Sequence, residues 1–167
     1  MMVCADITRA AATALCILFT SGAASGQATS GTLAIRTVAE VETVVRQDGH
    51  EFVKLAAAER VVPGDQVIYT LEIRNIGAAA VREPTVTNPI PPHMVYVAES
   101  ATGPGVETSY SVDGGHSFDK PENLRIPLAD GQSRQAIDKD YTHIRWKLKH
   151  PLKANSVAYA RFRAVVK

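Results

Sequence analysis

The chain has 167 residues, which is the size of one domain and leaves no room for a two-domain enzyme. It carries 18 basic and 17 acidic residues, so its net charge of +1 gives no electrostatic reason to bind nucleic acid or an anionic membrane. Hydrophobic residues make up 46% of the chain and charged residues 21%, and these values exclude disorder over most of its length.

The first 28 residues have the features of a secretory signal peptide. Arg9 precedes an apolar run at residues 10–20, and a stretch of small residues, SGAASGQA, follows that run. The run is too short to span a bilayer. We expect cleavage after Gly26 or after Ala28, and the residues do not distinguish these two sites. An uncleaved N-terminal anchor is the alternative.

Both cysteines, Cys4 and Cys16, lie inside this segment, so the expected mature domain at residues 29–167 has no disulfide. Neither cysteine follows the apolar and small residues that a lipoprotein signal needs. No later stretch is long and apolar enough to cross a membrane. We expect a secreted product without membrane insertion, located in the periplasm, in the extracellular space or at the cell surface.

Beyond residue 30, apolar and polar residues alternate with period two, and turn residues separate the runs. The three longest predicted strands are 66–74, 142–149 and 157–167. Shorter strands are predicted at 33–38, 41–47, 51–55, 85–88, 95–98 and 108–112. Asp48-Gly49 predicts a hairpin between two of them. The prolines at residues 89, 91 and 92 exclude a central strand there.

The longest predicted strands each place apolar side chains on one face. Those faces contain Val67, Tyr69, Leu71, Ile73, Ile144, Trp146, Leu148, Ala158, Ala160, Phe162, Ala164 and Val166. We expect Tyr69, Trp146 and Phe162 to be the core aromatics, with Tyr69 and Trp146 meeting inside. The pattern predicts an all-β protein, an immunoglobulin-like antiparallel β-sandwich of about seven to nine strands.

The stretch VPGDQVIYTLEIRNIGAAAVREPTVTNPIPPHMVYV carries a pattern of turns and strands. Pro63-Gly64-Asp65, Tyr69-Thr70, Asn75-Ile76-Gly77 and Asn88-Pro89-Ile90-Pro91 resemble the bacterial and archaeal family called domain of unknown function eleven. The segments SVDGGHSFD and DYTHIRW extend the resemblance to single-domain secreted members. The resemblance implies an immunoglobulin-like sandwich in surface or extracellular proteins and brings no catalytic residue. We expect a single copy without an anchor, which differs from the tandem arrays usual in the family.

The same turn residues have structural roles on physical grounds. Pro63 presets φ, Gly64 can take a positive φ, and Asp65 can accept hydrogen bonds from turn amides. Asn75 and Gly77 are expected to close the other end of the strand in a similar way.

The segment from Ser111 to Phe118 fits the loose hairpin motif Ser-x-Asp-x-Gly-x-Ser/Thr-aromatic of sialidase-type propellers. In that motif Asp113 would bond the turn amides, Gly115 would permit the turn, and the aromatic residue would cap the hairpin. One copy cannot make a propeller, so we expect a structural role.

No pattern predicts a catalytic, cofactor or metal site. The five histidines, at residues 50, 93, 116, 143 and 150, lack metal-ligand spacing. Asp130 and the acidic pair at residues 138 and 140 lack the order of a calcium loop, although a weak calcium site stays open. Nucleophile motifs are missing, and Trp146 alternates with core residues, which favours packing over sugar stacking.

We therefore predict a non-enzymatic secreted structural or assembly module without a cofactor, with a protein as partner. A carbohydrate- or protein-binding adhesion module is the alternative, and a hydrolase using Asp113, His116 and Asp119 is the remote one. Residues 32–47 are rich in β-branched residues and lack proline, so they could pair with another copy by strand exchange into filaments. Alternatively, they form the first strand of their own sandwich.

Overall fold

The computed structural model describes residues 32–167, so the predicted signal peptide and both cysteines lie outside the described residues. Within this range the chain is all-β and antiparallel, with two short 3-10 turns, η1 (Pro121–Asn123) and η2 (Asp138–Asp140), and no α-helix. The described range has no helix of the length and apolar character that a membrane span requires. The strands are β1 (Leu33–Gln47), β2 (His50–Ala57), β3 (Gln66–Asn75), β4 (Thr85–Pro89), β5 (Met94–Tyr96), β6 (Val106–Ser111), β7 (Arg125–Pro127), β8 (Ser133–Gln135), β9 (His143–Leu148) and β10 (Val157–Val166).

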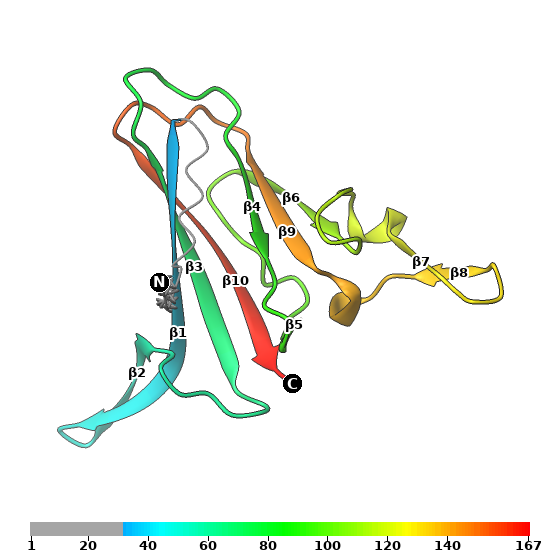
Figure 1. The fold of residues 1–167 in the computed structure, drawn as a ribbon. Helices are drawn as coiled ribbons and strands as arrows, with labels where there is room; N and C mark the ends of the chain where they lie inside the picture. The colour runs from blue at the N-terminus through cyan, green and yellow to red at the C-terminus, as the bar shows by residue number, and fades with distance from the viewer. Residues whose placement is uncertain (1–31) are drawn as a thin grey trace, which may run out of the picture.

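Two sheets enclose the core, and a third forms a small hairpin. The large sheet has the order β2-β1-β3-β10-β5, and the smaller sheet has the order β4-β9-β6. Strands β7 and β8 pair only with each other and extend away from the body on the side opposite the β1–β2 hairpin (Figure 1). The two larger sheets face each other with apolar side chains between them, an arrangement of the β-sandwich kind.

The predicted alternation fills this core. On β3 the inward residues Val67, Leu71 and Ile73 are buried, and on β9 Ile144 and Trp146 are completely buried. On β10 the buried residues are Ala158, Ala160, Phe162 and Ala164. The small alanines of β10 pair with the larger side chains of β3, as in Ala160 opposite Leu71. A period-two pattern therefore sufficed to identify the core face of the three longest strands.

The first predicted strands were wrong in their division. Residues 33–38 and 41–47 form one continuous strand, because Ala39 and Glu40 are not turn formers and Glu40 pairs on both sides, with Ile68 of β3 and Ala57 of β2. The strand predicted at residues 95–98 is shorter in the structure and begins one residue earlier, at Met94. Met94–Tyr96 pairs with the end of β10, and the chain then turns at residues 97–100. Strands β7 and β8 were missed because three residues are too few to show a period.

Ile68 lies on the outer face of the large sheet, yet only 1% of it is exposed. Arg163, its partner on β10, crosses β3 and contacts Gln66 at 2.7 Å and Glu42 of β1 at 2.8 Å. The aliphatic part of an arginine covers apolar surface in this way while its charged end stays in water. Alternation alone places Ile68 in solvent, and only the neighbouring strands explain its burial.

Candidate functional site

The turn before β3 positions that strand against β10. The Asp65 carboxylate accepts a hydrogen bond from the Val62 main-chain N–H at 2.8 Å, and Gly64 has a φ of 96°, which favours glycine. The Gly64 N–H donates to the Val166 carbonyl at 3.0 Å, and the Val166 N–H donates to the Asp65 carbonyl at 2.9 Å. Pro63 is exposed beside them. These bonds define where β3 begins relative to the last strand.

Asn75 closes the other end of β3 as a fully buried polar side chain. Its amide donates to the carbonyls of Ala79 at 2.8 Å and Leu152 at 2.9 Å, and its Oδ1 accepts from the Gly77 N–H at 2.9 Å. A Cβ at Gly77 would lie 2.7 Å from Cγ2 of Thr32. Asn75 and Gly77 therefore join β3, the start of β1 and the segment before β10.

The Asp113 carboxylate is the centre of the turn after β6. It accepts hydrogen bonds from the Ser117 hydroxyl at 2.6 Å, the Ser117 N–H at 3.0 Å, the Ser111 hydroxyl at 2.7 Å and the His116 N–H at 3.1 Å. These donors, Ser117 first, hold the pKa of Asp113 well below its usual range. Gly115, with a φ of 89°, donates its N–H to Ser111 Oγ at 2.9 Å. The carboxylate is saturated with turn donors.

His116 and Asp119, which the hydrolase hypothesis groups with Asp113, are each engaged locally. His116 Nδ1 contacts the main-chain oxygen of Asp113 at 2.5 Å, so the imidazole bonds the backbone of Asp113 and not its carboxylate. Asp119 accepts from Asn123 Nδ2 at 2.9 Å and from the Lys120 N–H at 2.7 Å, and these bonds lower its pKa. A general base needs a free lone pair and a pKa near the working pH. The pKa values of both aspartates are lowered, which is the wrong direction for a general base at neutral pH.

The predicted core aromatics connect the two sheets. The Tyr69 ring stacks on Phe162 at 4.8 Å between centroids, and Trp146 of the smaller sheet lies 6.0 Å from the same ring. Tyr69 and Trp146 therefore both pack on Phe162, and no direct Tyr69–Trp146 ring contact is found among the described residues; Tyr69 is only partly buried. The Trp146 indole N–H is buried and has no hydrogen-bond partner among the described residues. Burial makes this tryptophan a packing residue.

The acidic residues of η2 are in different environments. Asp140 accepts two hydrogen bonds from Arg134, at 2.6 and 2.7 Å, and this contact lowers the pKa of Asp140 to about 2. Burial, together with the charge of Glu99, raises the pKa of Asp138. Across residues 32–167, no three histidine, cysteine or acidic side chains are grouped so that they could hold a metal ion.

The outer edge of β1 has unpaired backbone groups. The Ile76 N–H donates to the Thr32 carbonyl at 2.8 Å, so Thr32 and every second residue after it face β3. Leu33, Ile35 and Thr37 therefore direct their N–H and C=O groups away from β3, and no described residue pairs with them. Strand β2 covers this edge only from Glu40 onward. We call residues 33–38 on this side the β1 notch.

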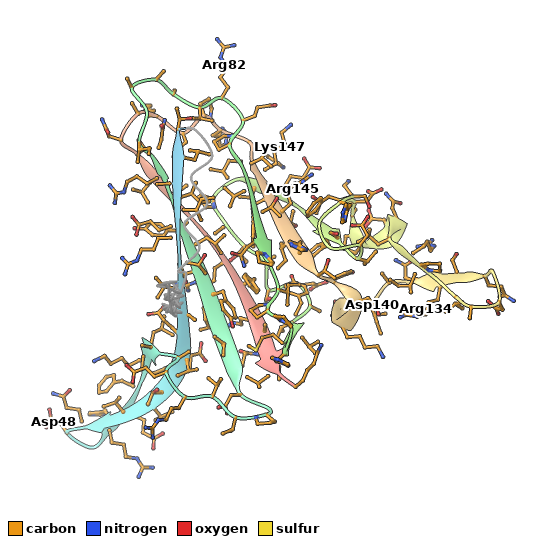
Figure 2. The ribbon with its side chains drawn as sticks, viewed as in Figure 1. Asp48, Arg82, Arg134, Asp140, Arg145 and Lys147 are labelled. Carbon is orange, nitrogen blue, oxygen red and sulfur yellow. The ribbon has the colours of Figure 1, made fainter. Side chains whose placement is uncertain are left out.

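Beyond Glu40 the β1–β2 hairpin leaves the body as a projecting ribbon, with Asp48 at its tip (Figure 2). We call residues 41–56 the arm. Asp48 and Gly49 have φ values of 52° and 78°, as a type I′ turn requires. Cross-strand partners share a face, so Val44 and Val53 lie on one face of the arm and Val45 and Phe52 on the other. All four are exposed, at 61%, 68%, 39% and 54%. Each face of the arm thus carries one exposed pair of apolar side chains.

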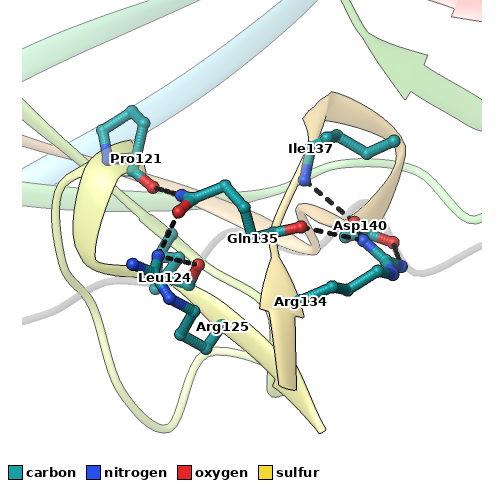
Figure 3. Close-up of polar contacts among 7 residues, drawn as sticks. All are labelled: Pro121, Leu124, Arg125, Arg134, Gln135, Ile137 and Asp140. Atoms are coloured by element: carbon teal, nitrogen blue, oxygen red, sulfur yellow. Dashed lines mark hydrogen bonds and ion pairs between the residues drawn. The ribbon is translucent and has the colours of Figure 1, made fainter. Parts of the chain in front are cut away.

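The β7–β8 hairpin is anchored by polar contacts at its base (Figure 3). Arg134 forms the ion pair with Asp140 of η2, and Gln135 bonds Arg125 and the carbonyl of Pro121. The exposed apolar residues Leu128 and Ile137 lie apart, at its tip and its base. This hairpin therefore has no exposed cross-strand apolar pair like those of the arm.

A shallow hollow of about 400 Å³ lies on the outer face of the smaller sheet. The Arg145 guanidinium lies 3.5 Å from the centre of the Phe118 ring, and Arg145 donates to Thr87 Oγ1 at 3.2 Å. Three bases and three acids line the hollow, namely Lys120, Arg145, Lys147, Glu83, Glu107 and Asp119. The hollow therefore has no net charge to select an ion, and the aromatic ring is already covered by Arg145.

The apolar surface of the arm was not predicted from the sequence, although a signal for it is present. Val44-Val45 and Phe52-Val53 are adjacent apolar pairs, and adjacent residues of a strand point to opposite faces. Placed on either side of the Asp48-Gly49 turn, they put apolar side chains on both faces of one hairpin. The covering of Phe118 by Arg145 had no comparable signal, because the two residues are 27 positions apart.

Comparison with family models, with curated proteins and with solved structures gave no match to this chain.

Proposed function

We propose that this protein is a non-enzymatic structural or assembly module that associates with copies of itself. The observation that carries the proposal is the open β1 notch beside an arm with apolar side chains on both faces. A strand edge with free backbone groups accepts an added strand, and exposed apolar patches mark protein contacts.

The polar residues support a role without catalysis. The carboxylates of Asp113 and Asp119 are engaged by turn donors, and Asp140 is engaged by Arg134. Each of these contacts stabilises a turn or a hairpin base. Because these carboxylates are engaged within the turns and the hairpin base, the exposed apolar residues of the arm are the features that no contact within the described chain explains.

We also propose export of the chain, on the basis of the pattern in residues 1–28. The mature protein would act in the periplasm, the extracellular space or at the cell surface. N-terminal sequencing of the protein recovered from cell fractions tests this. We expect a start near Gln27 or Thr29, whereas a start at Met1 or Met2 would contradict export with cleavage.

We propose that the fold is immunoglobulin-like and that the chain is a member of the family called domain of unknown function eleven. The structural support for this proposal is limited to the two-sheet architecture. Two facing antiparallel sheets support it. The strand order differs from the usual one, because the last strand, β10, lies beside β3 in the large sheet. In immunoglobulin domains the last strand belongs to the sheet that does not contain the first two strands.

Carbohydrate or protein adhesion is the second candidate, and the hollow around Phe118 is the feature that would serve it. Sugar binding usually needs a free aromatic face, and here the Arg145 guanidinium occupies the face of Phe118. The hollow therefore gives this alternative less support than the arm gives to assembly.

Sedimentation velocity of the full chain over a wide concentration range tests the assembly proposal. We expect association that weakens when Val44 and Val53 are both replaced by threonine. Val62→Thr is the matched control, because Val62 is exposed to 61%, as Val44 is, but lies outside the arm. A protein that stays monomeric at every concentration, or equal weakening by the control, would exclude the proposal.

A further inference from the structure

We infer that two copies of this protein pair through their β1 notches, with Ile35 of one chain opposite Ile35 of the other. The inference rests on the proposed self-association and specifies its geometry. It joins the two large sheets into one continuous antiparallel sheet.

The length of the notch selects the register. At one end, the Ala58 N–H donates to the Ala39 carbonyl at 3.0 Å, so β2 and the residue after it block the edge from Ala39 onward. At the other end, the described strand begins at Leu33. Residues 33–38 of a second copy, running antiparallel, fill this interval, and the same residues of the first copy fill the notch of the second.

The backbone directions agree with this register. Leu33, Ile35 and Thr37 direct their N–H and C=O groups outward. With Ile35 opposite Ile35, Leu33 lies opposite Thr37 of the second copy, so each outward residue meets another outward residue. Antiparallel residues of this kind exchange two hydrogen bonds per pair. A register with Ile35 opposite Arg36 would instead oppose groups that already bond β3. A register centred on Arg36 would place Leu33 opposite Ala39, whose carbonyl already accepts from the Ala58 N–H.

The side chains are also compatible. Arg36, the one charged residue of the notch, lies opposite Ala34 of the second copy, so the two arginines do not face each other directly. Leu33 and Ile35 belong to the inner face, where they already pack on the core. The pairing therefore extends the apolar face of each sandwich across the junction.

The arms do not obstruct the pairing. Strand β2 of each copy pairs with residues 40–47 of its own β1, on the same side as the notch. In the joined sheet it continues the line of the other copy's β1, beyond that strand's first residue. A contact of this type is isologous and closes at two copies.

Disulfide trapping tests the register in the full chain with Cys4→Ser and Cys16→Ser. Ala34→Cys and Arg36→Cys are prepared as separate variants. In the proposed register position 34 of one copy lies opposite position 36 of the other, in a non-hydrogen-bonded pair whose Cα atoms are about 4.5 Å apart, within disulfide range. Two copies of the same variant do not place their cysteines directly opposite each other. We expect oxidation to yield a covalent dimer from the mixture and none from either variant alone.

Proline substitution tests the edge by a second route. The Thr37 N–H faces the notch, so Thr37→Pro keeps the β1–β3 ladder but removes two donors per dimer. We expect the dissociation constant of the dimer to rise roughly tenfold or more. Val44→Pro is the control, because Val44 directs its N–H to the free edge of the arm, outside the notch. We expect it to weaken association no more than Val44→Thr does, because both substitutions remove the same exposed side chain and neither removes a donor of the notch.

The outcomes separate the two proposals. If the wild type associates but the mixture gives no cross-link, the register is wrong while self-association stands. If Val44→Pro, and not Thr37→Pro, abolishes association, the arm and not the notch is the interface. A monomeric wild type at every concentration removes both proposals. If Thr37→Pro does not fold, the cysteine mixture still decides.

Discussion

The two sides of the large sheet differ in whether the chain covers the outer edge of β10 and of β1. Along β10, strand β5 and the segment up to Thr102 cover the edge. The Val97 N–H donates to Arg163 O at 2.9 Å, and Thr102 and Arg161 exchange hydrogen bonds at 2.8 and 2.9 Å. Along the first half of β1, no described residue lies on the edge. The same sheet thus has one edge that its own chain covers and one edge along which no described residue lies.

Local sequence explains how the protected edge forms. Pro91 and Pro92 turn the chain back after β4, and β5 then pairs with the last residues of β10. Tyr96 holds this return in place, since its ring packs on Tyr110 and Tyr141 and its hydroxyl accepts from the Ala101 N–H at 3.0 Å. The chain thus covers one edge of β10 with its own residues, whereas the proposed contact uses the edge of β1 along which no described residue lies.

The largest effect is expected from Tyr96→Ala on the protected edge. Tyr96 is 3% exposed and lies in a cluster of three tyrosines, so the cavity should lower the free energy of unfolding by about 3–5 kcal/mol. Urea denaturation measures this change. Tyr159→Ala, which removes a tyrosine 54% exposed on β10, should change it by less than about 0.5 kcal/mol. Equal effects would mean that the edge segment does not stabilise the sheet.

A smaller loss, about 1 kcal/mol, is expected from Ser100→Ala. The Ser100 hydroxyl donates to Val97 O at 2.6 Å and accepts from the Arg163 N–H at 3.0 Å, so the substitution leaves that amide without its partner. Hydrogen exchange at the Arg163 amide should become faster than in a Ser133→Ala control, whose side chain is exposed. Unchanged exchange would show that the cover is held by other contacts.

Opposite pH dependence is expected from the two aspartates of η2, which lies against β5. The pKa of Asp140 is lowered to about 2, so its charge stabilises the fold above the usual carboxyl pKa of about 3.9, and this is lost as the pH falls toward 2. The pKa of Asp138 is raised, so its charge opposes folding at neutral pH and ceases to do so in acid.

At pH 7, therefore, Asp140→Asn should destabilise the protein and Asp138→Asn should stabilise it, each by less than about 1 kcal/mol. Thermal unfolding at pH 7 and near pH 2 measures both differences, which should shrink in acid. The same sign for the two variants at pH 7 would contradict this assignment.

The smallest effect on folding is expected from Phe52→Ser on the arm. The Phe52 side chain is 54% exposed and does not belong to the core, so the free energy of unfolding of the monomer should change by less than about 0.5 kcal/mol. Denaturation at low protein concentration measures this. A loss above 1 kcal/mol would show that the arm folds back on the sandwich and is not free to bind another chain.

Short-range patterns determined much of the fold. Alternation identified the core faces of β3, β9 and β10, because a half-buried strand needs apolar residues at every second position. Asp48-Gly49 identified the hairpin turn, because few residue pairs adopt two successive positive φ values. The Ser111 to Phe118 motif predicted that Asp113 would bond the turn amides, since all its partners lie within four residues.

Tertiary structure decided what the sequence left open. Whether residues 33–47 were one strand or two depended on Glu40 pairing with two different strands, which no local pattern encodes. The burial of Ile68 depended on Arg163, 95 positions later in the chain. The free edge of β1 likewise depended on where β2 stops. An edge exists where no neighbouring strand pairs, and the pairing of strands distant in sequence is decided by the packing of the whole sheet, not by the local pattern of β1.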